Sequence, residues 1–261
     1  MERRNKNLRV YEIYFSPTGG TKKVANIVAK GIGGEVLAVD MIKHPEKLHQ
    51  IEFKAEDVCL VAVPSYGGRV PTVVVDELKK IKGNGAKAVL VAVFGNRDID
   101  DTLTELQDVL TASGFTCFVG MEAVAEHSLM HQFAAGRPDL EDEKMLMLFA
   151  KEIKEKLAHG NGEAELNLPG SHDYKEYNVV PLKPKANKKC ISCGLCAKEC
   201  PAGAIPKDNP RMTDKEKCIS CMHCVSVCPK NTRHYSKLLS MIAGQKMKKN
   251  CTERKENKLY I

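Results

Sequence analysis

Eight of the eleven cysteines form two copies of one pattern, C-x2-C-x2-C-x3-C-P, in the C-terminal third of the chain. The first copy runs from Cys190 to Pro201 and the second from Cys218 to Pro229. Iron–sulfur clusters prefer thiolate ligands, and a cubane cluster needs four, three of which can come from one tight loop. Each copy therefore predicts most of the ligands of one [4Fe-4S] cluster, and the fourth ligand must come from elsewhere.

This repeat resembles the bacterial two-[4Fe-4S] ferredoxins over roughly 50 residues, with all eight cysteines and both prolines matched. In those proteins the cysteine before the proline binds the cluster of the other copy. The resemblance implies two ligand sets, one of Cys190, Cys193, Cys196 and Cys228 and one of Cys218, Cys221, Cys224 and Cys200.

Two other interpretations concern the same residues. A pair of structural zinc sites is one alternative, although zinc modules usually separate two cysteine pairs by a dozen residues or more. His223 lies inside the second copy and is a candidate ligand, because histidine replaces cysteine in some iron–sulfur centres. Because four cysteines are already present, we expect His223 to face solvent.

Hydroxyl groups and glycines occur together in the sequence Ser-Pro-Thr-Gly-Gly-Thr-Lys at residues 16–22, between a predicted strand and a predicted helix. Backbone N–H groups and the helix dipole favour an anion at such a turn. The segment matches neither the Walker loop nor the dinucleotide fingerprint, so it suits a phosphate ester such as that of FMN. The alternative is a hydroxyl-rich helix cap without a ligand.

The same loop resembles the flavodoxin phosphate loop, [ST]-x-T-G-x-T, at every defined position. The resemblance implies that the FMN phosphate is held by Ser16, Thr18, Gly19, Gly20 and Thr21, with Lys22 adding charge at the edge.

Two later loops resemble the isoalloxazine-binding loops of flavodoxin-like proteins. They contribute Pro64, Ser65, Tyr66, Gly67 and Gly68 from the first and Phe94, Gly95, Asn96 and Arg97 from the second. Tyr66 is a candidate for stacking on the ring, since the chain has no tryptophan. His127 and His131 lie in a third segment, which either covers the flavin edge or only leads into a helix.

Alternating strands and helices must position these loops. Apolar runs predict strands at residues 8–15, 35–40, 58–63, 88–94 and 115–119, and helical spacing predicts helices at 22–31, 72–81, 99–113 and 140–157. Strands alternating with helices predict an α/β fold with a parallel sheet. Five strands fit the doubly wound, flavodoxin-like sheet of order 2-1-3-4-5.

Composition divides the chain into four parts. We expect a flavodoxin-like FMN domain at 1–158, a Gly-, Asn- and Pro-rich linker at 159–186, a small α+β two-cluster ferredoxin domain at 187–235 and a basic tail at 236–261. Residues 237–249 are compatible with a membrane-surface or docking helix, but we expect the tail to pack back on one of the domains.

The net charge of +7 is unevenly distributed, at −3 for residues 1–186 and +10 for the rest. Clusters and an FMN phosphate would compensate this excess, so nucleic acid is not needed as a partner. Three scattered cysteines outside the repeat make a poor disulfide framework, which indicates a cytoplasmic protein. No apolar run approaches the ~20 residues that span a bilayer.

Together these features predict an electron-transfer flavoprotein that passes electrons between FMN, two [4Fe-4S] clusters and an external redox protein. Nearly the whole chain resembles the flavodoxin–ferredoxin fusion proteins of anaerobes. The alternative is an FMN-dependent reductase of a quinone or nitro compound, with a substrate pocket lined by Tyr66, Arg69, Arg97 or His131. A third class, a cluster-based regulator that contacts nucleic acid, lacks a helix-turn-helix pattern.

Overall fold

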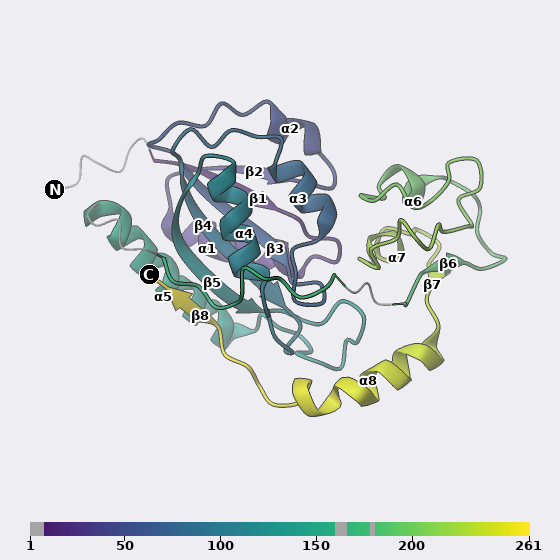
Figure 1. Cartoon of the computed structure of the whole chain (residues 1–261). Coiled ribbons are helices and arrows are strands. Elements are labelled where there is room, and N and C mark those ends of the chain that lie inside the picture. The colour runs from purple at the N-terminus through teal and green to yellow at the C-terminus, as the bar shows by residue number, and fades with distance from the viewer. Residues whose placement is uncertain (1–7, 160–165, 178–180) are drawn as a thin grey trace.

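A computed structural model describes residues 8–159, 166–177 and 181–261 of the chain. Its main sheet contains five parallel strands in the order β2-β1-β3-β4-β5 (Figure 1). Their bounds are β1 Arg9–Tyr14, β2 Glu35–Asp40, β3 Val58–Pro64, β4 Lys87–Phe94 and β5 Thr116–Val124. This is the flavodoxin-like order, so the predicted fold is confirmed.

Helices cover both faces of the sheet. On one face α1 (Gly20–Ile32) and α5 (Leu140–His159) bury a continuous apolar layer against the strands. On the other face lie α2 (Pro45–His49), α3 (Thr72–Leu78) and α4 (Thr102–Ala112). The central strands β3 and β4 are buried over nearly their whole length, which explains their unbroken apolar sequences.

The C-terminal tail returns to this domain, as expected. It forms α8 (Lys237–Cys251) and then β8 (Lys258–Tyr260), which pairs antiparallel with β5 as a sixth strand. The sequence did not predict β8, because three residues carry too little alternation to indicate a strand.

The cysteine repeat forms a small unit beside the carboxyl end of the sheet (Figure 1). It contains the short helices α6 (Leu195–Lys198) and α7 (His223–Ser226) and the antiparallel pair β6 (Lys185–Ala186) and β7 (Arg233–His234). Ile219 and Cys221 of the second copy join the apolar core of the larger domain. The two parts therefore share a packed interface.

The predicted linker is described in part, since residues 160–165 and 178–180 lie outside the described residues. Its described part runs along α4. The Thr104 hydroxyl donates a hydrogen bond to the Pro169 carbonyl, and the Ser171 and Lys175 backbone N–H groups donate to the Asp101 carboxylate. Residues 166–177 are thus held on the surface of the larger domain.

Glu12 is a carboxyl group in the central strand β1 and is only 4% exposed. Burial raises its pKa from 4.5 to about 7, and the positive charge of Lys22 opposes part of that rise. Below pH 4.5 the group is protonated in both the folded and the unfolded chain. As the pH rises through 7 the folded protein must accommodate a buried charge, so Glu12 destabilises the fold at alkaline pH.

We therefore expect Glu12→Gln to stabilise the protein at pH 8 and to have no effect at pH 4. The pKa shift corresponds to roughly 3 kcal/mol before solvent screening is allowed for, so the expected gain is about 1–2 kcal/mol. Denaturant unfolding at both pH values measures it, with the exposed Glu35→Gln as the control. An equal gain at both pH values would contradict the assignment of the effect to ionisation.

Candidate functional site

A cavity of about 370 Å³ lies at the carboxyl end of the parallel strands. The loops after β1, β3, β4 and β5 form its walls, which is where this fold places a ligand. Ten residues that the sequence assigned to flavin binding line it, namely Thr18, Gly20, Thr21, Pro64, Ser65, Tyr66, Gly67, Phe94, Gly95 and Arg97.

The first wall of the cavity is the start of α1. Gly19 is the N-cap of the helix and has a left-handed backbone (φ 97°). Neither a side-chain cap nor an acidic residue occupies the first turn. Thr18 and Thr21 present hydroxyl groups here, and the Ser16 hydroxyl accepts a hydrogen bond from the Lys22 N–H at 2.9 Å. This donor set fits a phosphate group, which helix N-termini favour.

Five of the predicted flavin-binding residues do not line the cavity: Ser16, Gly19, Lys22, Gly68 and Asn96. The Lys22 ammonium lies 5.6 Å from the centre of the Tyr14 ring. Gly68 has a left-handed backbone, and a Cβ there would lie 2.1 Å from a carboxylate oxygen of Asp100. Gly68 is thus required for packing against Asp100.

Asn96 anchors the C-terminal tail. Its side-chain amide donates to the carbonyls of Cys251 and Glu253, both at 2.7 Å, and its oxygen accepts from the Lys255 N–H at 3.0 Å. A contact between Asn96 and the flavin ring is therefore not supported by its position. Nothing in the local sequence indicates these partners, which lie more than 150 positions away.

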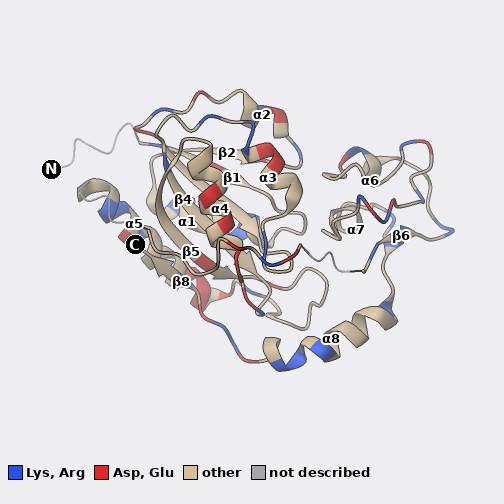
Figure 2. Cartoon of the chain, viewed as in Figure 1, with Lys and Arg blue, Asp and Glu red and all other residues tan. Residues whose placement is uncertain are grey.

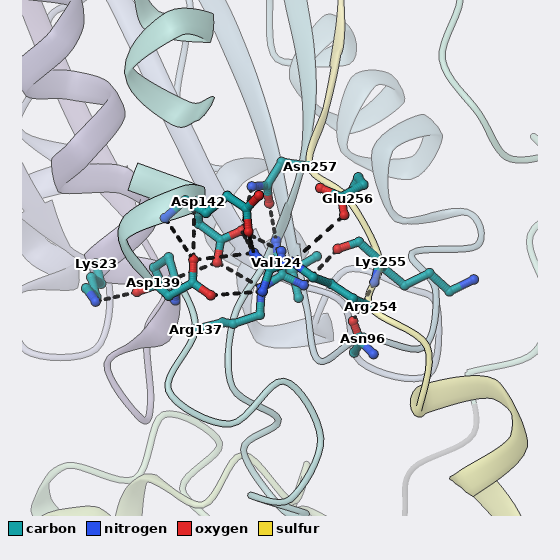
Figure 3. A network of polar contacts seen from close by, with 12 residues as sticks. Lys23, Asn96, Val124, Arg137, Asp139, Asp142, Arg254, Lys255, Glu256 and Asn257 are labelled. Atoms are coloured by element: carbon teal, nitrogen blue, oxygen red, sulfur yellow. Dashed lines mark hydrogen bonds and ion pairs between the residues drawn. The ribbon is translucent and has the colours of Figure 1, made fainter. Parts of the chain in front are cut away.

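The tail is fastened a second time by a buried polar network (Figure 3). Asp142 pairs with Arg137, and Asn257 donates to Asp142 at 2.9 Å while accepting from the Val124 N–H at 2.8 Å. Burial alone would raise the pKa of Asp142, but Arg137 and the other donors hold it below its ordinary value. The network keeps α8 in place, and Ala243, Lys246 and Met247 of α8 form one wall of the cavity.

The opposite wall belongs to the cysteine repeat. Ile219 and Ser220, between Cys218 and Cys221, line the same cavity as Thr18 and Tyr66. Tyr66 is half-buried, and burial raises the pKa of its hydroxyl well above the ordinary value. The second cysteine motif is therefore in contact with the candidate flavin site.

The expectation that His223 faces solvent is wrong. The side chain is buried at 5% exposure, its Nδ1 donates to the Pro17 carbonyl at 2.9 Å, and its Nε2 lies 3.0 Å from the Glu199 carboxylate. The Ser226 hydroxyl donates to the same Pro17 carbonyl at 3.0 Å. His223 thus joins the phosphate loop to the cysteine repeat, a role that depends on a carbonyl about 200 positions away.

The two histidines beyond β5 have different positions. His127 lines the cavity, and its Nδ1 accepts hydrogen bonds from the N–H groups of Leu129 (3.2 Å) and Met130 (3.3 Å), so the ring proton is on Nε2. Burial lowers the pKa of His127 to about 4, so it is a neutral donor at physiological pH. His131 is exposed, pairs with Glu126 and does not line the cavity.

The two arginines proposed for a substrate pocket form ion pairs with carboxylates. Arg69 pairs with Glu105 at 2.7 Å and lies outside the cavity lining. Arg97 lines the cavity but pairs with Asp100.

Two smaller cavities collect the cysteines in groups of four. One is lined by Cys190, Cys193, Cys196 and Cys228, and the other by Cys218, Cys221, Cys224 and Cys200. Each group takes its fourth cysteine from the other copy, the arrangement that the crossover implies. Four thiols around one small space are the donor set of a cubane cluster.

The sulfurs of the two crossing cysteines accept backbone hydrogen bonds. The N–H groups of Ala204 and Thr232 donate to the sulfurs of Cys200 and Cys228, each at 3.3 Å. Burial alone would raise the pKa of Cys228, but hydrogen bonds from Thr232 and from backbone N–H groups lower it to about 7. Thiolate is the form that binds iron.

Comparisons with known proteins agree with this division. Residues 189–233 match the family model described as a 4Fe-4S dicluster domain, which favours clusters over the zinc alternative. A putative diflavin flavoprotein A 2 of Thermosynechococcus vestitus is 31% identical over 115 residues, which are 41% of this chain and 20% of that protein. The chain therefore matches about a fifth of the length of that relative.

Solved flavodoxins are similar to the N-terminal part. One from the domain Archaea is 13% identical with a TM-score of 0.43, and covers 58% of this chain and 100% of its own. The flavodoxin of Streptococcus pneumonia TIGR4 is 21% identical with a TM-score of 0.40, and covers 57% and 99%. The strand order defines the flavodoxin-like domain. The family match defines the 4Fe-4S dicluster domain that follows it.

We expect Cys200→Ala to remove the cluster of the second motif and to leave that of the first. About one cluster per chain should remain by iron and acid-labile sulfide analysis. Anaerobic alkylation followed by mass spectrometry should label Cys218, Cys221 and Cys224. Cys228→Ala is the matched control and should instead expose Cys190, Cys193 and Cys196. Labelling of the first-motif cysteines in the Cys200 variant would disprove the crossover.

Proposed function

We propose that this protein carries electrons between a bound FMN, two [4Fe-4S] clusters and an external redox protein. The observation that carries the proposal is the shared cavity wall, in which Ile219 and Ser220 of the second cysteine motif face the same space as the phosphate loop. FMN takes up one or two electrons and each cluster takes one, so the combination converts electron pairs into single electrons.

The order of the centres is inferred from their surroundings. The group of Cys218, Cys221, Cys224 and Cys200 adjoins the flavin cavity through Ile219, which lines both cavities. The group of Cys190, Cys193, Cys196 and Cys228 reaches the surface, since Cys193 is exposed. We infer a route from an outside protein to the first-motif cluster, then to the second-motif cluster and to FMN.

The size and walls of the cavity support a carrier over the alternative, a reductase of a quinone or nitro compound. A volume of about 370 Å³ is at the low end for ligand pockets and suits the cofactor without a second molecule. The α8 wall and the cysteine repeat flank the space in which a substrate would have to stack on the ring. His127 and the phosphate-loop hydroxyls serve to hold and orient the flavin.

The surface around the outer cluster suits an acidic redox protein. Ile191 is 60% exposed beside Cys190 and Cys193. Figure 2 shows basic segments, together with some acidic ones, on the ribbon around α6 and β6. Five exposed cations are close to Ile191 in the sequence or contact this group of cysteines, namely Lys188, Lys189, Lys198, Arg211 and Lys230. Within the described part of the chain none of these five forms an ion pair. Unpaired cations around an apolar centre favour an acidic partner.

The setting we propose is the reducing cytoplasm of an anaerobe. All eleven cysteines are free of disulfides, which supports a reducing compartment. No described helix is both long and apolar enough to cross a membrane.

We expect Thr18→Val combined with Thr21→Val to weaken FMN binding by roughly 100-fold or more, since two hydrogen bonds to a charged phosphate are lost. Cluster content should not change. Fluorescence titration with FMN measures the affinity, and Thr111→Val with Thr116→Val, two exposed threonines, is the control. An unchanged FMN affinity would place the phosphate elsewhere.

Flash photoreduction of the anaerobic holoprotein tests the electron transfer itself. Electrons placed on the clusters should reach the flavin at a rate that does not depend on protein concentration, and this phase should vanish in the double threonine variant. Clusters that are reduced while the flavin stays oxidised would refute the proposed function.

Charge reversal tests the docking surface. We expect Lys188→Glu with Lys189→Glu to slow electron exchange with an acidic [2Fe-2S] ferredoxin by about 10-fold at low ionic strength, and the difference should shrink as salt is added. Lys248→Glu with Lys249→Glu makes the same charge change on α8 and should have little effect. Equal slowing by both pairs would show that the partner senses only net charge.

A further inference from the structure

Arg233, at the start of β7, is a buried cation within the cysteine repeat. Its side chain is 3% exposed and lines the first-motif cavity. One terminal nitrogen donates to the Cys196 sulfur at 3.6 Å and to the Pro210 carbonyl at 2.7 Å. The other donates to the Pro184 carbonyl at 3.0 Å and to the Thr213 hydroxyl. All of these partners are uncharged groups or a cysteine ligand.

The charge of Arg233 has no carboxylate partner among the described residues. Its Nε–H is also buried without a hydrogen-bond partner in the described chain. An arginine cannot lose its proton, and a buried cation is costly unless an anion compensates it. The arrangement therefore needs negative charge close to Arg233, and the thiolate-ligated clusters are the anions that the surrounding cysteines imply.

The guanidinium lies between the two cysteine groups. Arg233 lines the cavity of the first-motif group, and its hydrogen-bond partners Pro184 and Thr213 line the cavity of the second-motif group. One buried cation is thus close to both groups of cluster ligands.

We propose that Arg233 is a charge-compensating residue that raises the reduction potentials of both [4Fe-4S] clusters. A cluster becomes more negative by one charge when it takes up an electron, so a nearby buried cation stabilises the reduced form. The N–H···S hydrogen bond to Cys196 acts in the same direction. This inference rests on the proposed function only in that the cysteines hold clusters.

A structural role alone would give a different result. Arg233 joins Pro184, Pro210 and Thr213 by hydrogen bonds to neutral oxygens, and loss of those bonds would lower thermal stability. Such a role does not require the cluster potentials to change. Potentials and stability must therefore be measured on the same samples.

The test is an EPR-monitored redox titration of the holoprotein with Arg233→Gln and Arg233→Lys. Both midpoint potentials should shift to more negative values in the glutamine variant, and the lysine variant, which keeps the charge, should lie closer to the wild type. Arg211→Gln is the matched control, since this exposed arginine donates to the Cys190 carbonyl at 2.9 Å. Solvent screens its charge, so its effect should be small.

A second pair of variants leaves Arg233 in place. Thr213→Asp introduces a carboxylate where the Thr213 hydroxyl accepts from Arg233, which should neutralise the cation and lower both potentials, whereas Thr213→Asn should not. Unchanged potentials in the Arg233→Gln and Thr213→Asp variants that carry both clusters, or shifts no larger than those of Arg211→Gln and Thr213→Asn, would overturn the proposal. If the glutamine variant fails to load clusters, the Thr213 pair decides.

The flash experiment separates the two hypotheses. Normal cluster-to-flavin transfer with unchanged potentials defeats the role of Arg233 alone. Shifted potentials without any transfer to the flavin defeat the proposed function and leave the role of Arg233 standing.

Discussion

The carbonyl oxygen of Pro17 accepts hydrogen bonds from two side chains of the second cysteine motif, His223 at 2.9 Å and Ser226 at 3.0 Å. Pro17 belongs to the phosphate loop, and His223 and Ser226 bound the short helix α7. This contact lies beside Ile219 and Ser220, which form a wall of the candidate flavin cavity. Together with the packing of Ile219 and Cys221 in the apolar core of the larger domain, it fixes the second cysteine motif against the phosphate loop.

The tail has a related role on the other side of the cavity. Helix α8 has exposed apolar residues and only a few buried ones, so its own packing holds it weakly. Its position is secured instead at its C-terminal end, by the hydrogen bonds of Asn96 and Asn257 and by the pairing of β8 with β5. Because Asp142 is buried beneath Arg137 and Asn257, this attachment is polar but shielded from water.

The positive charge of the C-terminal part is found both in the interior and on the surface. The formal excess of +10 in residues 187–261 includes a buried cation, Arg233, and an exposed group around Cys193. In the function that we propose, the buried charge acts on the clusters because little solvent screens it, and the exposed lysines attract an acidic redox protein. Similar residues in one sequence thus have different effects according to burial.

Local sequence patterns were sufficient to predict the sheet order and the 4Fe-4S dicluster domain, because each depends on a periodic or closely spaced motif. Three further features arise only from long-range packing. Asn96 binds the tail, His223 binds Pro17, and Arg233 lies between two cysteine groups. The partners of these side chains are distant in sequence, and many are backbone carbonyls, which every residue possesses and which therefore leave no trace in the amino-acid pattern.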